Sequence, residues 1–157
     1  MADAKMLAKL ARTAITDEWH AHFQYWIGSI IMSPQIDHIV FEFREHAENE
    51  FDHATKLGMW LRNVPRDAHL PYALSELKSP YCGYIFPAGN QPYSLVADAI
   101  KGEQCAIEFY TKFIEIESET EHIGSDLARI LREILDDEKD HLIDLQKIQD
   151  LLKYHGQ

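Results

Sequence analysis

The chain has 157 residues, of which 46% are hydrophobic, and it carries a formal net charge of −11 at pH 7. This length predicts one domain over residues 1–157 with a sizeable core, and the apolar content excludes a disordered chain. The acidic charge opposes binding to nucleic acid, which needs clustered Lys and Arg, and no apolar run is long enough to cross a membrane.

Hydrophobic spacing and proline placement predict four long helices, over residues 3–32, 35–63, 93–120 and 124–154. Pro34 indicates a short turn between the first two helices. The stretch "EHIGSD" indicates another short turn between the last two helices, with Ser125 as a candidate N-cap. Because short turns join antiparallel neighbours, each pair of helices is expected to form a hairpin.

Residues 64–91 form a different kind of segment, without helical spacing and with most of the chain's prolines in or beside it. Each predicted helix is roughly 42 Å long at 1.5 Å per residue. A segment of this length can run along a whole helix, so the second and third helices are expected to lie parallel. The predicted fold is therefore all-α, an antiparallel four-helix bundle with one long crossover connection.

Each predicted helix carries an apolar seam that a glutamate interrupts near its middle. In the last helix the seam recurs at steps of four and three residues, at Leu127, Leu131, Ile134, Glu138, His141, Leu145, Ile148 and Leu152. The other three seams contain Glu18, Glu50 and Glu103, and His53 follows Glu50 as His141 follows Glu138. A buried charge is costly unless it is paired or bound to metal, so these residues predict a functional site.

The two halves of the chain repeat one plan, in which a helix with a lone glutamate precedes a helix with Glu-x-x-His. Tyr25 and Tyr110 repeat as well, each seven residues after the lone glutamate of its half. Four carboxylates at one level of a core would repel each other, and two divalent cations would remove that repulsion. Oxygen and nitrogen ligands favour iron or manganese. The alternative is a set of buried acids that hydrogen-bond to each other for structural reasons.

Other polar residues near the seams have two interpretations each. His22 lies one turn after Glu18 and is either an extra ligand or, on the interpretation that we favour, a core histidine beside the ligands. One turn before the second-helix pair, three residues either feed iron to the site or form a solvated face: Glu45, His46 and Asn49.

Four stretches, "TDEWHAHFQY", "EHAENEFDHA", "KGEQC" and "EILDDEKDH", resemble the ferritin-like superfamily, with the nearest likeness to bacterioferritin and to the Dps-like thioferritins. The resemblance implies that two iron ions per subunit, or manganese in their place, bind to Glu18, Glu50, His53, Glu103, Glu138 and His141. It implies that Glu50 and Glu138 bridge the ions and that Tyr25 lies beside them. It also implies a ferroxidase, which oxidises Fe(II) with oxygen or hydrogen peroxide and stores ferric mineral inside a homo-oligomeric shell that protects against oxidative stress.

Two features of the sequence differ from particular branches of this superfamily and exclude properties of those branches. Bacterioferritin binds haem through a methionine between the glutamate and the histidine of its second helix. This chain has Phe51 at that position, so no haem is expected. Mini-ferritins whose iron sites are shared between subunits do not fit either, because this chain holds a complete set of ligands itself.

The chain has two cysteines, Cys82 in the predicted crossover and Cys105 in the third helix. Cys105 lies about 200° around the helix from Glu103, on the outside of the bundle, where the crossover is expected to run. A cysteine pair near the metal site resembles the thioferritin branch, which implies a disulfide, a twelve-subunit shell and peroxide as the preferred oxidant. The alternative is two unpaired buried cysteines, which behave as small apolar residues.

Two other functions remain as alternatives to iron storage. The first is a di-metal enzyme that uses iron or manganese without storage, as a peroxidase or a catalase does. A rubrerythrin with its additional iron domain would need four cysteines, and this chain has two. The second is a metal-free interaction bundle. Basic residues interrupt the first stretch, "MADAKMLAKLAR", so it does not resemble a secretory signal, and a cytoplasmic location is expected.

Overall fold

The structure is a computed structural model that describes residues 4–32, 37–64, 77, 80–120 and 125–155. These residues form four helices and no strand, and the helices are α1 (Ala4–Ile31), α2 (Asp37–Leu61), α3 (Pro92–Ser118) and α4 (Ser125–His155). Each bound agrees with the sequence prediction to within two residues. The predicted turn at Pro34 and the capping side chain of Ser125 lie outside the part of the chain that the structure describes.

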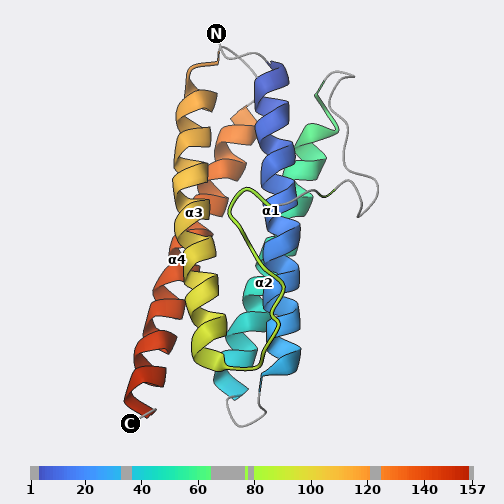
Figure 1. Cartoon of the computed structure of the whole chain (residues 1–157). Coiled ribbons are helices and arrows are strands. Elements are labelled where there is room, and N and C mark those ends of the chain that lie inside the picture. Colours follow the sequence, from blue (N-terminus) through green and yellow to red (C-terminus); the bar gives the residue numbers. More distant parts are fainter. Residues whose placement is uncertain (1–3, 33–36, 65–76, 78–79, 121–124, 156–157) are drawn as a thin grey trace.

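The helices form an antiparallel bundle with one crossover, as predicted. In Figure 1, α1 and α2 run in opposite directions, as do α3 and α4, whereas α2 and α3 run in the same direction. Of the connection from α2 to α3, residues 80–91 run along the bundle in front of α1 to the start of α3, and these residues are called the crossover from here on. The main packing is between α1 and α2 and between α3 and α4, and further contacts join α2 to α4 and α1 to α3.

The predicted seams form the core of the bundle. All of their positions are buried except Leu152, which is half-buried. The apolar seam residues separate into two clusters, one that includes Leu61 and Phe113 and another that includes Phe43 and Leu145. The interrupting glutamates and histidines lie between these clusters. Because burial of each aliphatic side chain is worth about 1.5–3 kcal/mol, the two apolar clusters can hold this polar layer in place.

Buried polar side chains of α1 fix the path of the crossover. The carboxylate oxygen Oδ1 of Asp17 accepts hydrogen bonds from the backbone N–H groups of Tyr81, at 2.6 Å, and Cys82, at 3.4 Å. The side-chain oxygen of Gln24 accepts a third from the N–H of Ile85, at 2.8 Å. Burial raises the pKa of Asp17 to about 6, against the opposite effect of the two N–H donors. These contacts replace the backbone pairing that an irregular segment lacks.

Side chains of α3 hold the same segment from the other side. Cys82 and Cys105 form a disulfide, with their Cα atoms 5.4 Å apart, so the implied pairing is present in the structure. Tyr84 is buried against Gly102, where an added Cβ would lie 2.3 Å from the tyrosine ring. The crossover is therefore attached to both α1 and α3, directly outside the polar layer.

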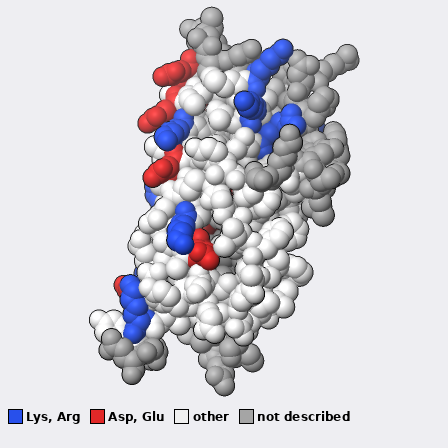
Figure 2. All heavy atoms as spheres, in the orientation of Figure 1, with Lys and Arg blue, Asp and Glu red and all other residues white. Residues whose placement is uncertain are grey.

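On the face shown in Figure 2, charged side chains gather along the left edge and at the top, and the centre and lower part hold few of them. Large apolar side chains of α1 and the crossover are about half exposed or more, namely Trp26, Ile30, Tyr81, Ile85 and Phe86. Exposed apolar surface of this kind is typical of a protein–protein contact. Among the described helices, none combines the length and the apolar character needed to cross a membrane.

Candidate metal centre

The six predicted ligands meet in the polar layer at the centre of the bundle. All four helices contribute, and each of the six side chains is at most 3% exposed: Glu18, Glu50, His53, Glu103, Glu138 and His141. The heptad-like spacing of the seams produces this convergence, because it turns the same face of every helix towards the core. The structure therefore brings together every residue that the sequence singled out for metal binding.

The ligand atoms fall into two groups that share two carboxylates. One group consists of Glu18, Glu50, His53 and Glu138, and the other consists of Glu50, Glu103, Glu138 and His141. Within each group, one ligand atom from every residue lies within 4.8 Å of the others. Glu50 and Glu138 belong to both groups, which is the position that a carboxylate needs if it is to bridge two metal ions.

Both histidines direct Nδ1 into the carboxylate cluster. Nδ1 of His53 lies 3.0 Å from Glu50 Oε2, 3.3 Å from Glu18 Oε2 and 3.4 Å from Glu138 Oε1. Nδ1 of His141 lies 3.3 Å from Glu50 Oε1 and 3.5 Å from Glu138 Oε2. This common orientation leaves Nε2 of each ring on the outer side of the cluster, where it can be held by other groups.

Burial and mutual repulsion divide the four carboxyl groups into two kinds. Burial, reinforced by the charge of Glu138, raises the pKa of Glu18 and of Glu103 well above the ordinary value. Burial acts in the same direction on Glu50 and Glu138, but the two imidazoles outweigh it and hold the pKa of both carboxyls below the usual range. Glu50 and Glu138 are therefore the carboxylates that stay ionised without metal.

The imidazoles carry the matching positive charge. Burial would lower the pKa of His141, but the charge of Glu50 and the nearby carboxylate of Glu138 raise it to about 10. Burial also opposes the protonation of His53, and hydrogen bonds with four carboxylates, the largest effect coming from Asp137, raise the pKa of its ring well above normal. Without metal, two protonated imidazoles thus balance two carboxylates.

The cluster leaves several buried polar atoms without a hydrogen-bond partner. Four of its atoms make no hydrogen bond within the described structure, namely Glu50 Oε1, Glu103 Oε2, Glu138 Oε2 and His141 Nδ1. The atoms of Glu50 and His141 are close enough for a hydrogen bond, but their orientation does not allow one. A buried unpaired polar atom costs about 1–3 kcal/mol, and metal binding would give all four a partner. These residues therefore fit a pair of divalent metal ions.

A tyrosine hydrogen-bonds to each of the two lone glutamates, Glu18 and Glu103. Tyr25 donates its phenolic hydrogen bond to Glu103, and Tyr110 donates one to Glu18. Each tyrosine therefore holds the lone glutamate of the other half of the chain. The sequence shows Tyr25 and Tyr110 at repeat positions, and the resemblance implied Tyr25 beside the ions, but neither predicted this exchange between halves.

Two further side chains orient the histidines, and sequence reasoning missed the first of them. Nε2 of His53 donates to Asp137 Oδ2 at 3.1 Å. The side-chain amide of Asn49 lies 3.1 Å from Nε2 of His141. An imidazole that binds metal through Nδ1 carries its proton on Nε2, so the amide of Asn49 would turn its oxygen towards the ring. Such outer partners fix the tautomer and direction of a metal-binding imidazole.

The sequence also singled out His22 and, one turn before Glu50, a group of three polar residues on α2. His22 belongs to neither ligand group; it is half-buried, and its Nδ1 lies 2.7 Å from the backbone oxygen of Ala47. Glu45 and Asn49 are exposed, but His46 is only 2% exposed, so the prediction of a solvated face is wrong for His46. Its ring stacks on His141, with the ring centres 4.0 Å apart.

Comparison with known proteins identifies the family. The family model for rubrerythrin matches residues 9–149, which include all six seam glutamates and histidines. The chain belongs to the rubrerythrin family. Rubrerythrin-like and ferritin-like proteins are di-iron oxidoreductases, and the buried cluster of carboxylates and imidazoles can bind metal as such proteins do.

The structure of this rubrerythrin-family chain is similar to that of a dodecameric thioferritin, the bacterioferritin-related protein from Bacteroides fragilis. The two share 25% sequence identity with a TM-score of 0.86, over 98% of this chain and 90% of the other. The predicted membership of the ferritin-like superfamily is confirmed. A search of curated proteins finds no match.

Proposed function

We propose that this chain is a ferroxidase, which oxidises Fe(II) with hydrogen peroxide or oxygen and keeps the ferric product inside an oligomeric shell. The observation that carries this proposal is the double membership of Glu50 and Glu138 in the two ligand groups. Carboxylates shared in this way hold two ferrous ions side by side, so that a two-electron oxidant can take one electron from each.

The reaction balances with peroxide as the oxidant. Two ferrous ions lose one electron each, the O–O bond breaks as peroxide accepts both electrons, and two protons complete two water molecules. The residues of this chain supply position and charge for that step. Glu50 and Glu138 hold the two substrate ions together, while Glu18 and Glu103 each bind on one side and are steadied by a tyrosine. Four carboxylates also favour the more highly charged ferric products.

A closed homo-oligomeric shell would supply the storage space. Support comes from the fold shared with a dodecameric thioferritin, from the disulfide beside the polar layer, and from the exposed apolar side chains of α1 and the crossover. Those apolar residues suit contacts between subunits. Twelve copies of an 18.2 kDa chain have a mass of roughly 220 kDa.

A second candidate function follows from the family match. Rubrerythrin gives its name to the family model that fits residues 9–149, and this favours a peroxidase or catalase-like enzyme that uses iron or manganese without storing it. Such an enzyme would consume peroxide repeatedly and would need no shell.

The test begins with metal-free protein and an anaerobic titration with Fe(II), followed by peroxide or oxygen. Binding should saturate near two ions per chain, and ferric absorbance should then appear in proportion. Gel filtration coupled to light scattering should give a particle mass of about 220 kDa, twelve times the chain mass, and the iron should elute with that particle. Saturation at one ion or none would refute the site, whereas repeated peroxide turnover by a small oligomer would favour the second candidate.

A matched pair of variants separates the effect of losing a ligand from the effect of losing a negative charge. Glu103→Gln changes a ligand in the core, and Glu108→Gln makes the same chemical change on the exposed surface of the same helix. Only Glu103→Gln should lower the stoichiometry and the rate of oxidation.

A further inference from the structure

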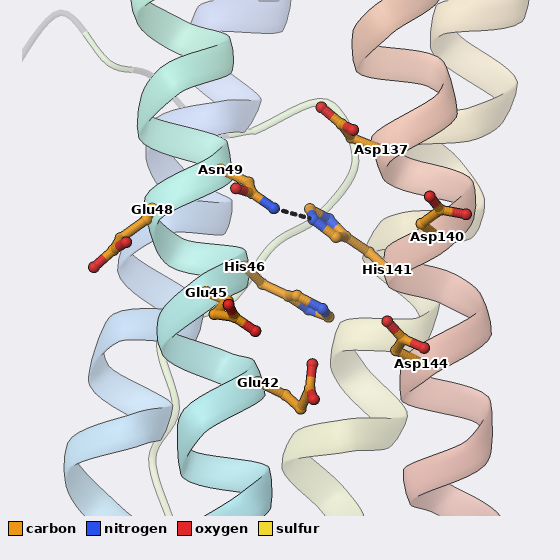
Figure 3. A pocket seen from close by; sticks show the side chains of 9 residues that line it. All are labelled: Glu42, Glu45, His46, Glu48, Asn49, Asp137, Asp140, His141 and Asp144. Carbon is orange, nitrogen blue, oxygen red and sulfur yellow. Dashed lines mark hydrogen bonds between the residues drawn. The ribbon is translucent and has the colours of Figure 1, made fainter.

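Beyond the central cluster, the surface between α2 and α4 holds a pocket of about 250 Å³ (Figure 3). Its lining contains neither Lys nor Arg and has six acidic residues, which are Glu42, Glu45, Glu48, Asp137, Asp140 and Asp144. His46 and His141 also line it. Because His141 is one of the six central residues, the pocket reaches from solvent to the edge of the metal centre.

Three residues of this pocket are arranged as a separate ligand group. Glu42, His46 and Asp144 each offer a ligand atom, and these atoms lie within 4.8 Å of one another. Glu42 and His46 are four residues apart on α2 and so share one face of that helix. Asp144 completes the group from α4. In Figure 3 the ring of His46 reaches from α2 towards α4, with the carboxylates of Glu42 and Asp144 beside its nitrogen atoms.

His46 is the observation that distinguishes this group from ordinary surface acid. The side chain is 2% exposed, and its Nδ1 is buried without a hydrogen-bond partner in the described structure. Its contacts are made by the ring faces and edges, with the ring centres of His141 at 4.0 Å and Tyr25 at 5.1 Å. A buried imidazole without a polar partner is costly unless something binds it, and here two carboxylates stand next to it.

The carboxylates of Glu42 and Asp144 repel each other, and the positive charge beside them does little to balance this repulsion. Burial and the charge of Asp144 raise the pKa of Glu42. Lys147 lies on the surface beside them, with its Nζ 2.8 Å from Asp144 Oδ1 and its side chain 67% exposed. An exposed ion pair of this kind contributes little, so Lys147 does not remove the repulsion between the two acids.

We propose that Glu42, His46 and Asp144 form a third divalent-cation site, separate from the two central groups. Two carboxylate oxygens and one imidazole nitrogen suit first-row divalent ions such as ferrous iron, manganese or zinc. Three protein ligands leave the remaining positions to water, so the bound ion can exchange readily. A further step, which rests on the proposed function, is that this site receives ferrous substrate and passes it along the pocket to the centre beside His141.

The site can be located with zinc, which does not undergo oxidation. Crystals of the metal-free protein soaked in Zn²⁺ should show anomalous scattering peaks in the central cluster and a separate peak between Glu42, His46 and Asp144. The double variant Glu42→Gln/Asp144→Asn should lose the outer peak and keep the central ones. Its matched control is Glu48→Gln/Asp140→Asn, which removes the same charge from the same pocket and should keep every peak.

The possible results are distinguishable. Central peaks without an outer peak in the wild type would overturn the third site and leave the proposed function intact. An outer peak without central peaks would support the third site and overturn the proposed two-ion centre. The supply role is tested at low Fe(II), where Glu42→Gln/Asp144→Asn should slow oxidation several-fold with an unchanged final stoichiometry, and the control should not. Equal rates in the two variants would overturn the supply role.

Discussion

Tyr110 donates its phenolic hydrogen bond to Glu18, across 92 positions of the sequence. Both side chains are buried, and the bond joins α3 to α1, the two helices that carry a lone glutamate. Tyr25 makes the reciprocal bond, from α1 to Glu103 of α3. This exchange couples the two halves of the chain through the carboxyl groups of the two lone glutamates.

Replacement of Tyr110 by phenylalanine should therefore weaken both the fold and the metal centre. The change leaves the buried oxygen Oε1 of Glu18 without its tyrosine donor, at a cost of about 1–3 kcal/mol in the metal-free protein. Loss of such an orienting partner typically weakens metal binding about tenfold or more. Urea unfolding and ferrous titration measure the two effects. Tyr154→Phe is the control, because Tyr154 is 83% exposed, and an equal loss in that variant would contradict the role of the hydrogen bond.

The sequence was sufficient for the helices and for the convergence of the six central side chains because both depend on local periodicity. A glutamate at the middle of an apolar seam, such as Glu138, can face only the core once the helix forms. Four such seams in one bundle must bring their glutamates to a common level. Helix ends at residues such as Pro92 are also local features, because proline favours the first turn of a helix.

The residues that the sequence did not reveal depend on how elements lie against each other. Asp137 precedes a ligand and lies off the seam, so its contact with His53 follows only from the packing of α2 against α4. Asp17 and Gln24 are buried because the crossover passes over them. The path of a segment without periodicity cannot be predicted from its sequence. His46 is a similar case, because its burial requires His141 of the neighbouring helix.

Metal uptake should release protons. The raised pKa values of Glu18 and Glu103, and the pKa of about 10 for His141, mean that the metal-free centre holds protons at pH 7 that metal ions must displace. Apparent affinity should consequently fall as the pH is lowered. Calorimetric titrations with Zn²⁺ in buffers of different ionisation enthalpy give the number of protons released, and identical heats in all buffers would contradict the prediction.

The disulfide between Cys82 and Cys105 should stabilise the protein by constraining its unfolded state. The cysteines are 23 residues apart, and closing a loop of this size contributes roughly 3 kcal/mol. Cys82→Ser/Cys105→Ser should lower the unfolding free energy by about this amount, and reduced wild type should match it. Thiol counting should find no free thiol in the oxidised chain and two after reduction. A disulfide-linked dimer would be evidence against pairing within one chain.

Gly102→Ala should displace the crossover. The new methyl group would lie 2.3 Å from the ring of Tyr84, so the buried tyrosine must move away from α3. Overpacking of this kind costs about 1–3 kcal/mol. Gly89→Ala is the control within the same region, since an added Cβ there meets nothing within 4 Å. Thermal unfolding of both variants, with the disulfide intact, measures the difference, and equal melting temperatures would show that Tyr84 yields without cost.

Glu138 and His141 carry opposite charges in the metal-free centre, so removing one of them should differ from removing both. In the metal-free centre, Glu50 and Glu138 are ionised and His53 and His141 are protonated, as their shifted pKa values indicate. Glu138→Leu alone leaves one positive charge unmatched, and His141→Leu alone leaves one negative charge unmatched. Each single change should cost roughly 3–5 kcal/mol, because it strands a buried charge.

The double variant Glu138→Leu/His141→Leu removes one charge of each sign and restores a continuous apolar seam from Leu127 to Leu152. Apolar side chains in place of a buried ion pair are often neutral or stabilising, so the metal-free double variant should melt no lower than wild type and keep its helix content. The comparison needs metal-free samples, because bound metal stabilises only the wild type. Ferrous oxidation should be lost, since the variant lacks one shared carboxylate and one imidazole. If the double variant instead loses the sum of the two single effects, Glu138 and His141 serve the fold itself, and the explanation of their place in the seam as metal ligands is wrong.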